Sequence, residues 1–224
     1  MQSLDISTIH IIVKTYCALL MVDIDNSEIF RIVRKGTIIR MKTLIFNGSP
    51  RKNGDTASLL RVFKEAIGGD IQQIDAYFCK IKPCSDCRYC WTHHGCAIRD
   101  EMQRVYTLID EADNIVIASP IYFSELTGAL LNILSRLQYL YVSKTFRATD
   151  TLTEKRRNGV ILLAGGGDGA PTRAAETAAC LLHQMDAEVI GTVCSHNTNR
   201  LPACQDTAAK ANIRTLAKKI LSHI

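Results

Sequence analysis

The chain has 224 residues, of which 47% are hydrophobic and 22% are charged, and its formal net charge is +5. These values are typical of a folded globular protein, and the length suits one domain of about 150 to 200 residues with an appendage. Basic and acidic residues alternate along the chain, which argues against nucleic acid as the partner and is compatible with an anionic cofactor or an acidic protein.

The first forty residues, Met1–Arg40, differ in pattern from the rest of the chain. Their one apolar run, Ile9–Val22, is interrupted by Lys14. A membrane span takes about 20 apolar residues, and a secretory signal needs a small-residue cleavage site, so we expect neither a membrane nor a secretory segment. We expect an N-terminal extension outside the fold, followed by a functional domain over residues 41–224. The alternative is that the segment adds a helix or a strand to that domain.

From Thr43 onward, short β-branched runs alternate with amphipathic helical patterns. Such runs predict strands that are buried on both faces of a parallel sheet. The expected strands are Thr43–Phe46, Ile71–Phe78, Ile115–Ala118, Val160–Leu163 and Val189–Val193. Apolar residues at helical spacing occur within Leu59–Ile67, Met102–Ile109, Leu130–Leu137, Ala175–Leu182 and Ile213–Ile220. Right-handed crossovers then predict an open, doubly wound α/β sheet whose ligand lies outside the carboxyl ends of the strands.

The loop after the first expected strand, Gly48–Asp55, is rich in turn-forming residues and leads into a helix expected to open at Thr56. Backbone N–H groups at a helix N-terminus favour an anion. The side chains that can add donors or charge are Ser49, Arg51, Asn53 and Thr56. The loop lacks both the Gly-Lys-Ser/Thr ending of a nucleotide-hydrolysing loop and the G-x-G-x-x-G dinucleotide pattern. We therefore favour a terminal phosphate monoester; an ordinary capped turn is the alternative.

Two further loops are expected at the same edge of the sheet. The third strand runs into Ser119–Ser124, where Tyr122 and Phe123 offer aromatic faces for a flat ring, unless they are core residues. The fourth strand runs into the glycine-rich Gly165–Pro171. This segment fits a dinucleotide fingerprint poorly, even with Glu188 as the ribose acid. We expect these residues, which lack side chains, to let the backbone lie against a flat ligand.

Four of the nine cysteines form a C-x2-C-x2-C-x5-C run consisting of Cys84, Cys87, Cys90 and Cys96. They are too crowded for a secreted disulfide framework, so we expect a reducing cytoplasm and thiolate ligands. Four soft thiolates suit a [4Fe-4S] cluster. The alternatives are free thiols without a cluster, and zinc with His93 or His94 as a further ligand. The other cysteines, which we expect to be small apolar core residues, are Cys17, Cys79, Cys180, Cys194 and Cys204.

The segments Asn47–Thr56, Ser119–Tyr122 and the glycine loop resemble the FMN-contacting segments of the flavodoxin-like NAD(P)H-dependent FMN reductase family. The cysteine run resembles the compact motif of the iron–sulfur flavoprotein branch of that family. The likeness extends from about Met41 to the C-terminus and includes Ser195–Pro202. It implies a flavodoxin-like three-layer sandwich with a five-stranded parallel doubly wound sheet.

The same resemblance implies a role for individual residues. The phosphate of FMN would be held by Ser49, Arg51, Asn53 and Thr56. The ribityl chain and the isoalloxazine ring would be flanked by Pro120, Ile121, Tyr122 and Phe123. The ring would be bordered by Gly165, Gly166 and Gly167. One departure is Asp55, where the family often has Asn, and because a carboxylate beside a phosphate is costly we expect Asp55 to cap the helix instead.

The combination of FMN with a cluster predicts an FMN-dependent oxidoreductase that passes electrons between NAD(P)H or reduced ferredoxin and an acceptor, with the cluster as a one-electron relay. One alternative is a cluster-free NAD(P)H-dependent FMN or quinone reductase, and another is a non-enzymatic flavin electron carrier or redox sensor. No general acid or base stands out, and a proton relay through His93 and His94 is a weaker alternative. Family likeness also implies a homodimer or homotetramer.

Overall fold

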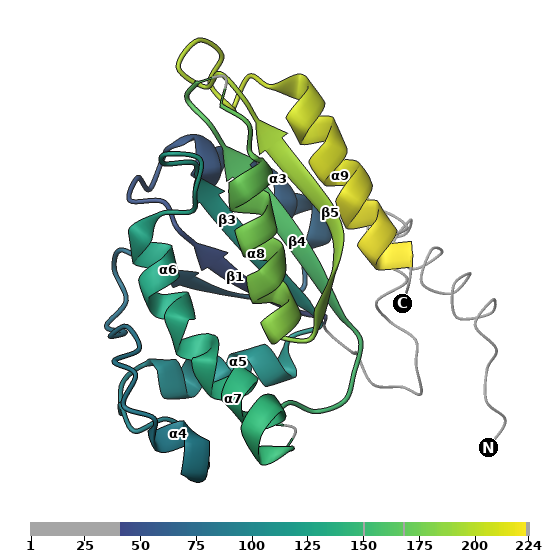
Figure 1. The fold of residues 1–224 in the computed structure, drawn as a ribbon. Coiled ribbons are helices and arrows are strands. Elements are labelled where there is room, and N and C mark those ends of the chain that lie inside the picture. The colour runs from purple at the N-terminus through teal and green to yellow at the C-terminus, as the bar shows by residue number, and fades with distance from the viewer. Residues whose placement is uncertain (1–40, 150, 168, 223–224) are drawn as a thin grey trace, which may run out of the picture. The chain divides into compact units, whose positions relative to one another are not determined.

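The computed structural model describes residues 41–149, 151–167 and 169–222, and within them one sheet of five parallel strands has the order β2-β1-β3-β4-β5 (Figure 1). The strands are β1 (Lys42–Asn47), β2 (Asp70–Asp75), β3 (Asn114–Pro120), β4 (Arg157–Ala164) and β5 (Ala187–Ser195). The predicted doubly wound parallel sheet is confirmed. The expectation that Met1–Arg40 form an extension concerns residues outside the described ones and stays a prediction.

Burial follows the position of each strand in the sheet. All seven residues of the central strand β3 are buried, whereas Ile74 is the buried residue of the edge strand β2. The predicted strand Ile71–Phe78 is too long at its carboxyl end. The backbone N–H groups of Phe78 and Cys79 both donate to the carbonyl oxygen of Asp75, so the chain turns there and leaves the sheet.

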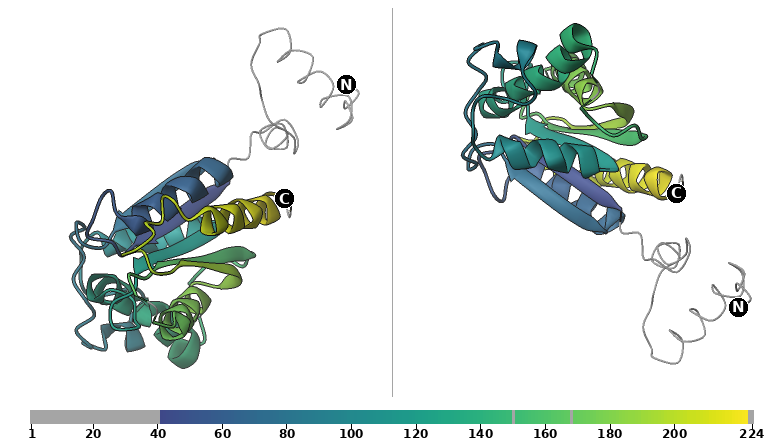
Figure 2. Two further views of the ribbon diagram at one scale, coloured as in Figure 1. Left: turned by 90° about the horizontal axis from the view of Figure 1, so that it is seen from above. Right: turned by 90° about the horizontal axis from the view of Figure 1, so that it is seen from below.

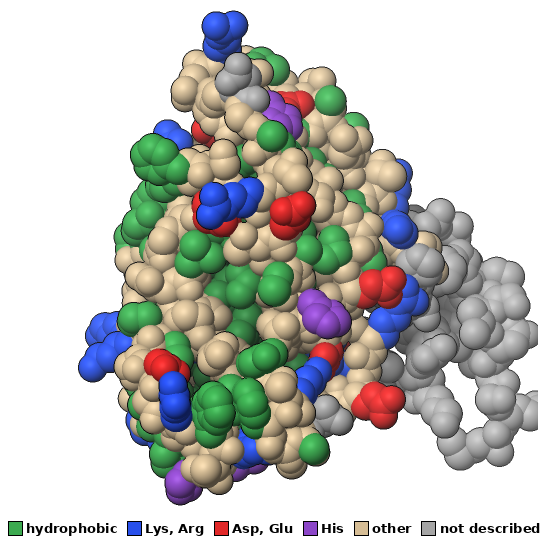
Figure 3. Space-filling view, viewed as in Figure 1, with side chains coloured by type: hydrophobic (Ala, Val, Ile, Leu, Met, Phe, Trp, Pro, Cys, Tyr) green, Lys and Arg blue, Asp and Glu red, His purple; other side chains and the backbone are tan. Residues whose placement is uncertain are grey.

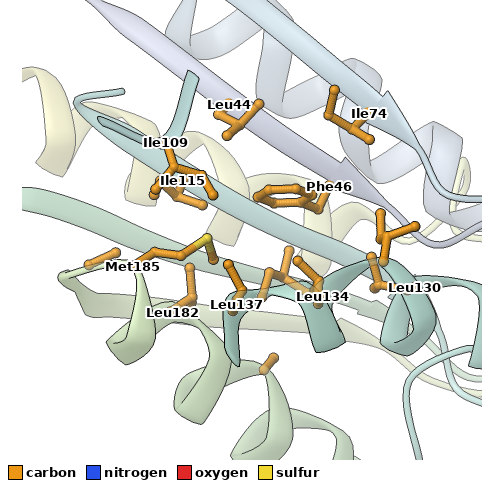
Figure 4. Close-up of a cluster of buried hydrophobic side chains, with 14 of the residues drawn as sticks. Leu44, Phe46, Ile74, Ile109, Ile115, Leu130, Leu134, Leu137, Leu182 and Met185 are labelled. Carbon is orange, nitrogen blue, oxygen red and sulfur yellow. The ribbon is translucent and has the colours of Figure 1, made fainter. Parts of the chain in front are cut away.

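Helices cover both faces of the sheet, giving three layers (Figure 2). One face carries α3 (Asp55–Ile67) and α9 (Thr207–Ser222). The other carries α5 (Met102–Glu111), α6 (Gly128–Leu134), α7 (Gln138–Arg147) and α8 (Thr172–Gln184). The core on this second face is built from apolar side chains of β1, β3 and the helices, among them Phe46, Ile115, Leu134 and Leu182 (Figure 4).

Two helical segments were not expected from the sequence. The stripe predicted over Leu130–Leu137 divides into α6 and the 3-10 turn η1 (Ser135–Leu137), after which α7 begins at Gln138. Ser143 lies on the buried face of α7 and donates its hydroxyl to the carbonyl of Tyr139 at 2.8 Å, so this helix lacks a purely apolar stripe. The short helix α4 (Tyr89–Thr92) lies within the cysteine run.

None of the helices in the described parts of the chain is both long enough and apolar enough to cross a membrane.

Candidate functional site

Three loops predicted from the sequence meet at the carboxyl edge of the sheet, where the strands β1, β3 and β4 end (Figure 1). The hydroxyl of Thr127 donates to the carbonyl of Gly48 at 2.8 Å, which joins the first loop to the start of α6. The backbone N–H of Ile121 donates to the carbonyl of Ala164 at 2.9 Å, which joins the second loop to the third. The fold therefore brings the candidate FMN-binding residues to one edge.

Gly48 is required by packing within the protein. A Cβ atom at this position would lie 2.8 Å from Oγ1 of Thr127 and 2.9 Å from both Oγ of Ser119 and Cδ2 of Leu130. The Gly48 N–H in turn donates to the carbonyl of Ala118 at 2.7 Å. The first turn of the loop is therefore held against β3 and α6 before the chain reaches the predicted phosphate site.

The side chains of the first loop order the loop and leave charge at its surface. Oδ1 of Asn47 accepts the N–H of Ser49 at 3.1 Å, and Oγ of Ser49 accepts the N–H of Arg51 at 3.2 Å. The Arg51 side chain is 70% exposed. Asn53 is exposed, whereas Thr56 is buried in the first turn of α3. Of the four predicted phosphate ligands, Arg51 and Asn53 are therefore exposed, and Ser49 and Thr56 are buried.

The prediction that Asp55 caps α3 is wrong. The N-cap residue is Gly54, and no side chain caps the first turn. Oδ1 of Asp55 instead accepts the backbone N–H of Ala203 at 2.9 Å, and Oδ2 lies 3.7 Å from Arg51. Because no side chain caps the N-terminus of α3, its first N–H groups suit a phosphate, so the loop fits the terminal group of FMN.

Positive charge accumulates beside this loop. A cavity of about 310 Å³ lies between α3 and β2 and shares residues with the loop. Its basic residues are Lys52, Arg61 and Lys64. The ammonium group of Lys52 also lies 5.5 Å from the centre of the Phe78 ring. This charge favours an anion at the neighbouring helix N-terminus.

The second loop ends in a strained turn. Tyr122 and Glu125 exchange two backbone hydrogen bonds of 2.9 and 3.0 Å, and the two residues between them, Phe123 and Ser124, have φ angles of +52° and +65°. Left-handed backbone costs an L-residue roughly 1–2 kcal/mol. The Phe123 side chain is fully exposed, with a relative exposure of 102%. The strain thus holds an aromatic ring in solvent at the carboxyl edge, as a flat ligand would require.

In the glycine loop, the three predicted glycines have different surroundings. A Cβ at Gly166 would lie 2.8 Å from the side chain of Asn199, whereas a Cβ at Gly165 would be 3.5 Å from Ile121 and one at Gly167 would be in open space. The absence of a side chain at Gly166 is therefore explained by the protein. Gly165 is buried, and its N–H and carbonyl are bonded to Ser195 and Thr198, whereas Gly167 is exposed and leaves room for a ligand. Glu188, near the start of β5, lies at the opposite end of the strands, so the dinucleotide alternative is wrong.

The four cysteines of the C-x2-C-x2-C-x5-C run line one pocket beside η1 and α7. Cys84 is fixed by its backbone N–H, which donates to Oγ of Ser135 at 2.9 Å. Burial raises the pKa of the Cys90 thiol, and the charges of the other three cysteines act in the same direction. The four cysteines thus share one pocket, although no group of three or more His, Cys, Asp or Glu in the described residues is placed to hold a metal ion. Four thiolates are the donor set of a [4Fe-4S] cluster, and a cluster here stays a prediction.

The pocket lies away from the start of α6, where the first two loops meet. Seven residues of helix and 3-10 turn lie between Gly128 and Arg136, so the two are about 12 Å apart along the axis. Figure 1 shows α4 beside the end of α7, at the other end of the molecule from the loop after β4. The candidate flavin-binding edge and the cysteine pocket are therefore two separate places in the described domain.

Aromatic side chains cover the outer side of the cysteine pocket. Trp91, which lines the pocket, stacks on Phe146 of α7 with 4.3 Å between ring centres. Both rings are partly exposed, at 38% and 52%. The face seen in Figure 3 carries apolar side chains over this region, with charged residues around them.

The zinc alternative finds no support in the described residues, where no group of three or more His, Cys, Asp and Glu is placed to hold a metal ion. The pocket lining includes neither histidine of the run. His93 instead stacks on Tyr89 at 4.3 Å, and His94 meets the edge of Tyr139 at 5.9 Å.

The expectation that the remaining cysteines are core residues is partly wrong. Cys180 and Cys204 are exposed, while Cys79 and Cys194 are half-buried. Burial raises the pKa of Cys194 to about 11, and the Asp206 charge adds to that shift. Cys17 lies outside the described residues.

Sequence reasoning missed the residues that hold the cysteine segment in place. The guanidinium of Arg136 in η1 is completely buried and lies 2.9 Å from the carboxylate of Asp100, which follows the segment. Burial alone would raise the pKa of Asp100, but hydrogen bonds from the Lys82 N–H, Arg136 and the Met102 N–H hold that pKa below its ordinary value. Arg136 is far from the cysteines in sequence, and its only sequence signal is a charge within an apolar helical stripe.

The chain matches the protein family described as NADPH-dependent FMN reductase over residues 41–221. The chain belongs to this family. Among curated relatives of this FMN reductase family member, an iron–sulfur flavoprotein of Methanosarcina thermophila is 25% identical over 186 residues, or 80% of this chain and 93% of the relative. An iron–sulfur flavoprotein of Archaeoglobus fulgidus is 26% identical over 130 residues, or 57% of this chain and 56% of the relative. The chain thus spans about half the length of that relative, and the resemblance to this branch of the family is confirmed.

Solved structures agree with the family assignment at the level of the fold. RosB with a bound 8-demethyl-8-formylriboflavin-5'-phosphate has a TM-score of 0.61 at 18% identity, covering 82% of this chain and 79% of that chain. The NAD(P)H:quinone oxidoreductase from Methanothermobacter marburgensis has a TM-score of 0.58 at 14% identity, covering 83% of this chain and 96% of that chain. The predicted flavodoxin-like three-layer sandwich is confirmed.

Proposed function

We propose that this FMN reductase family member is an FMN-dependent oxidoreductase. It would transfer electrons between NAD(P)H or ferredoxin and an acceptor, with a [4Fe-4S] cluster on Cys84, Cys87, Cys90 and Cys96 as the relay. The observation that carries the proposal is that one chain combines a flavin-type carboxyl edge with four cysteines lining a single pocket. Family membership over residues 41–221 supports the flavin half of the proposal.

In this proposal, the chain places and orients the cofactors. FMN supplies hydride acceptance and one-electron release, and a cluster carries single electrons. The N-terminus of α3 and Arg51 would hold the phosphate of FMN. Phe123 would lie against the ring, and the glycine loop, exposed at Gly167, would border its edge. The four cysteines would hold the cluster beside η1.

The second candidate is a cluster-free NAD(P)H-dependent FMN or quinone reductase. It is favoured by the finding that no group of three or more His, Cys, Asp and Glu among the described residues is placed to hold a metal ion. In that case Cys84, Cys87, Cys90 and Cys96 would be free thiols of a structural loop. A third candidate, a flavin electron carrier or redox sensor without turnover, shares the same FMN site.

The experiment that separates these candidates is anaerobic purification followed by a visible spectrum and by assays for iron, acid-labile sulfide and FMN. We expect one FMN and about four irons per chain, with iron lost and FMN kept in Cys87→Ser. The matched control is Cys180→Ser, an exposed cysteine outside the pocket, which should keep both. FMN without iron would support the cluster-free reductase, and FMN without turnover of either pyridine nucleotide would support the carrier.

We also propose a reducing, cytoplasmic location and a homodimer or homotetramer, on the grounds of cysteine usage and family likeness. Light scattering of the FMN-loaded protein tests the oligomeric state.

A further inference from the structure

We propose that Arg136 is a positioning residue of the four-cysteine site, where its buried positive charge raises the reduction potential of the cluster. This inference rests on the proposed function, because it concerns the cluster that the four cysteines would hold. It assigns a role to a residue that lies outside the cysteine run and outside the flavin-binding edge.

The contacts of Arg136 close the cysteine segment at both of its ends. Nη1 donates to the carbonyl of Lys82 at 3.0 Å, two residues before the first cysteine. Nη2 donates to the carbonyl of Ile98 at 3.1 Å, two residues after the last cysteine. Arg136 also lines the pocket that the four cysteines line. One side chain therefore fixes both ends of the segment and forms part of the wall between them.

The hydrogen-bonding capacity of Arg136 is only partly used by the protein around it. Its side chain is 0% exposed, its carboxylate partner is Asp100 at 2.9 Å, and its Nε–H is a buried donor with no partner among the described residues. Burial alone would lower the pKa of Arg136, but Asp100, Tyr106 and the Cys96 thiol raise it, so the guanidinium stays charged. A buried cation with spare donor capacity is costly unless further negative charge lies nearby.

Reduction of a cluster in this pocket would supply that negative charge. One electron enters from the donor, no bond forms or breaks, and the net charge of the site becomes one unit more negative. A fixed cation in a low-dielectric wall stabilises the reduced form more than the oxidised form. The competing explanation is that Arg136 acts only as a clamp, in which case its charge would not affect the potential.

Arg157 provides a matched control for the clamp explanation. Its side chain is also 0% exposed and lies 3.0 Å from a carboxylate, that of Asp110. It donates to the backbone carbonyls of Ile109 at 3.2 Å and Thr153 at 3.1 Å, as Arg136 does to two others. It does not line the cysteine pocket. Loss of Arg157 therefore removes a comparable clamp without removing charge from the candidate cluster site.

The test is a dye-mediated redox titration of the cluster-loaded protein, followed by its visible spectrum. In Arg136→Met, we expect the equilibrium constant for one-electron reduction to fall about tenfold, which is about 59 mV. In Arg157→Met, we expect a change of less than about twofold. Arg136→Lys, which keeps the charge, should restore the constant to within about threefold of the parent. Asp100→Asn, which removes the opposing charge, should raise the constant.

The outcomes separate this inference from the proposed function. If the parent protein contains the cluster, and Arg136→Met shifts the potential no more than Arg157→Met, the inference is overturned and the relay stands. If the parent contains no iron, both are overturned. If Arg136→Met cannot retain iron, the variants Arg136→Lys and Asp100→Asn decide. The inference is supported if the equilibrium constant for one-electron reduction is kept in Arg136→Lys and raised in Asp100→Asn. It is overturned if that constant is lowered in Asp100→Asn.

Discussion

The hydroxyl of Thr127 donates a hydrogen bond of 2.8 Å to the carbonyl oxygen of Gly48, across 79 residues of sequence. The same Oγ1 would lie 2.8 Å from a Cβ at Gly48. The first loop of the flavin-binding edge is therefore packed against the N-terminus of α6 with no room for a side chain.

Gly48→Ala should destabilise the protein by about 2 kcal/mol, because overpacking a tight contact costs about 1–3 kcal/mol. FMN binding should weaken with it, since the loop must shift away from α6. Urea unfolding and quenching of FMN fluorescence measure the two effects. Gly128→Ala, where a Cβ meets nothing within 4 Å, is the control and should leave stability unchanged or higher. Equal unfolding midpoints for the two variants would contradict the packing argument.

Phe123→Gly should separate stability from flavin binding. Glycine relieves the left-handed strain, which is worth roughly 1–2 kcal/mol, and loses little burial because the ring is fully exposed. Stability should therefore stay within about 1 kcal/mol of the parent or rise, while FMN affinity falls up to about tenfold through lost ring contact. Tyr141→Ala, a 40% exposed aromatic on α7, should leave FMN affinity unchanged. If FMN affinity is unaltered in Phe123→Gly, the Phe123 ring does not contact FMN.

We expect Asp55 to stabilise the protein through its hydrogen bond to the backbone N–H of Ala203. Asp55→Ala leaves the buried N–H of Ala203 without its acceptor, at a cost of about 1–3 kcal/mol. Asp55→Asn keeps an oxygen at the same place and should cost less than half as much. Urea unfolding gives both values, and hydrogen exchange at the Ala203 amide should quicken in the alanine variant alone. Equal losses in the two variants would point to the Asp55 charge instead.

Asp206 should contribute stability that depends on pH. Its Oδ1 accepts the N–H of Ala209 at 2.9 Å, capping α9, and its Oδ2 accepts the Ser195 hydroxyl at 2.7 Å. Burial alone would raise the pKa of Asp206, but hydrogen bonds from Ala209, Ser195 and Ala208 lower it. A carboxyl with a lowered folded-state pKa stabilises above its unfolded pKa of about 3.9, and that stability is lost as pH falls through the folded pKa.

In Asp206→Asn, this acid-sensitive contribution is absent. Asparagine can still cap the helix but lacks the negative charge at its N-terminus, so the parent should be more stable than the variant by up to about 1 kcal/mol at pH 6, and this difference should close toward pH 2. Urea unfolding across that range provides the measurement. Glu176→Gln, an exposed change on α8, is the control. If the difference in unfolding free energy between the parent and Asp206→Asn stays constant with pH, the ionised form of Asp206 is not the source of the stability.

The strands and most helices were predictable because their residues follow a simple pattern of burial. The five apolar runs lie within the five strands, except at Ile71–Phe78, where the edge strand ends early at Asp75. Helix α7 escaped prediction because Tyr139 and Ser143 take buried positions that the sequence pattern reserves for aliphatic residues.

The candidate site was predictable only where its parts are close in sequence. The spacing of the four cysteines indicated that they converge, and they line one pocket. The partners of Asp55 and Asp100 lie at Ala203 and Arg136, so only the folded chain shows which side chain each carboxylate meets. Asp55 illustrates the error that follows, because a local cap was assumed where a distant backbone group is bound.

The double anchorage of the cysteine segment by Arg136 has a consequence for its local unfolding. Because one side chain holds the carbonyls of both Lys82 and Ile98, breaking its contacts frees both ends of the segment at once. Segments of this kind open as cooperative units with their own free energy. The half-buried thiols of Cys84, Cys90 and Cys96 would then meet oxidants together, whereas Cys87 is already exposed while the segment is folded.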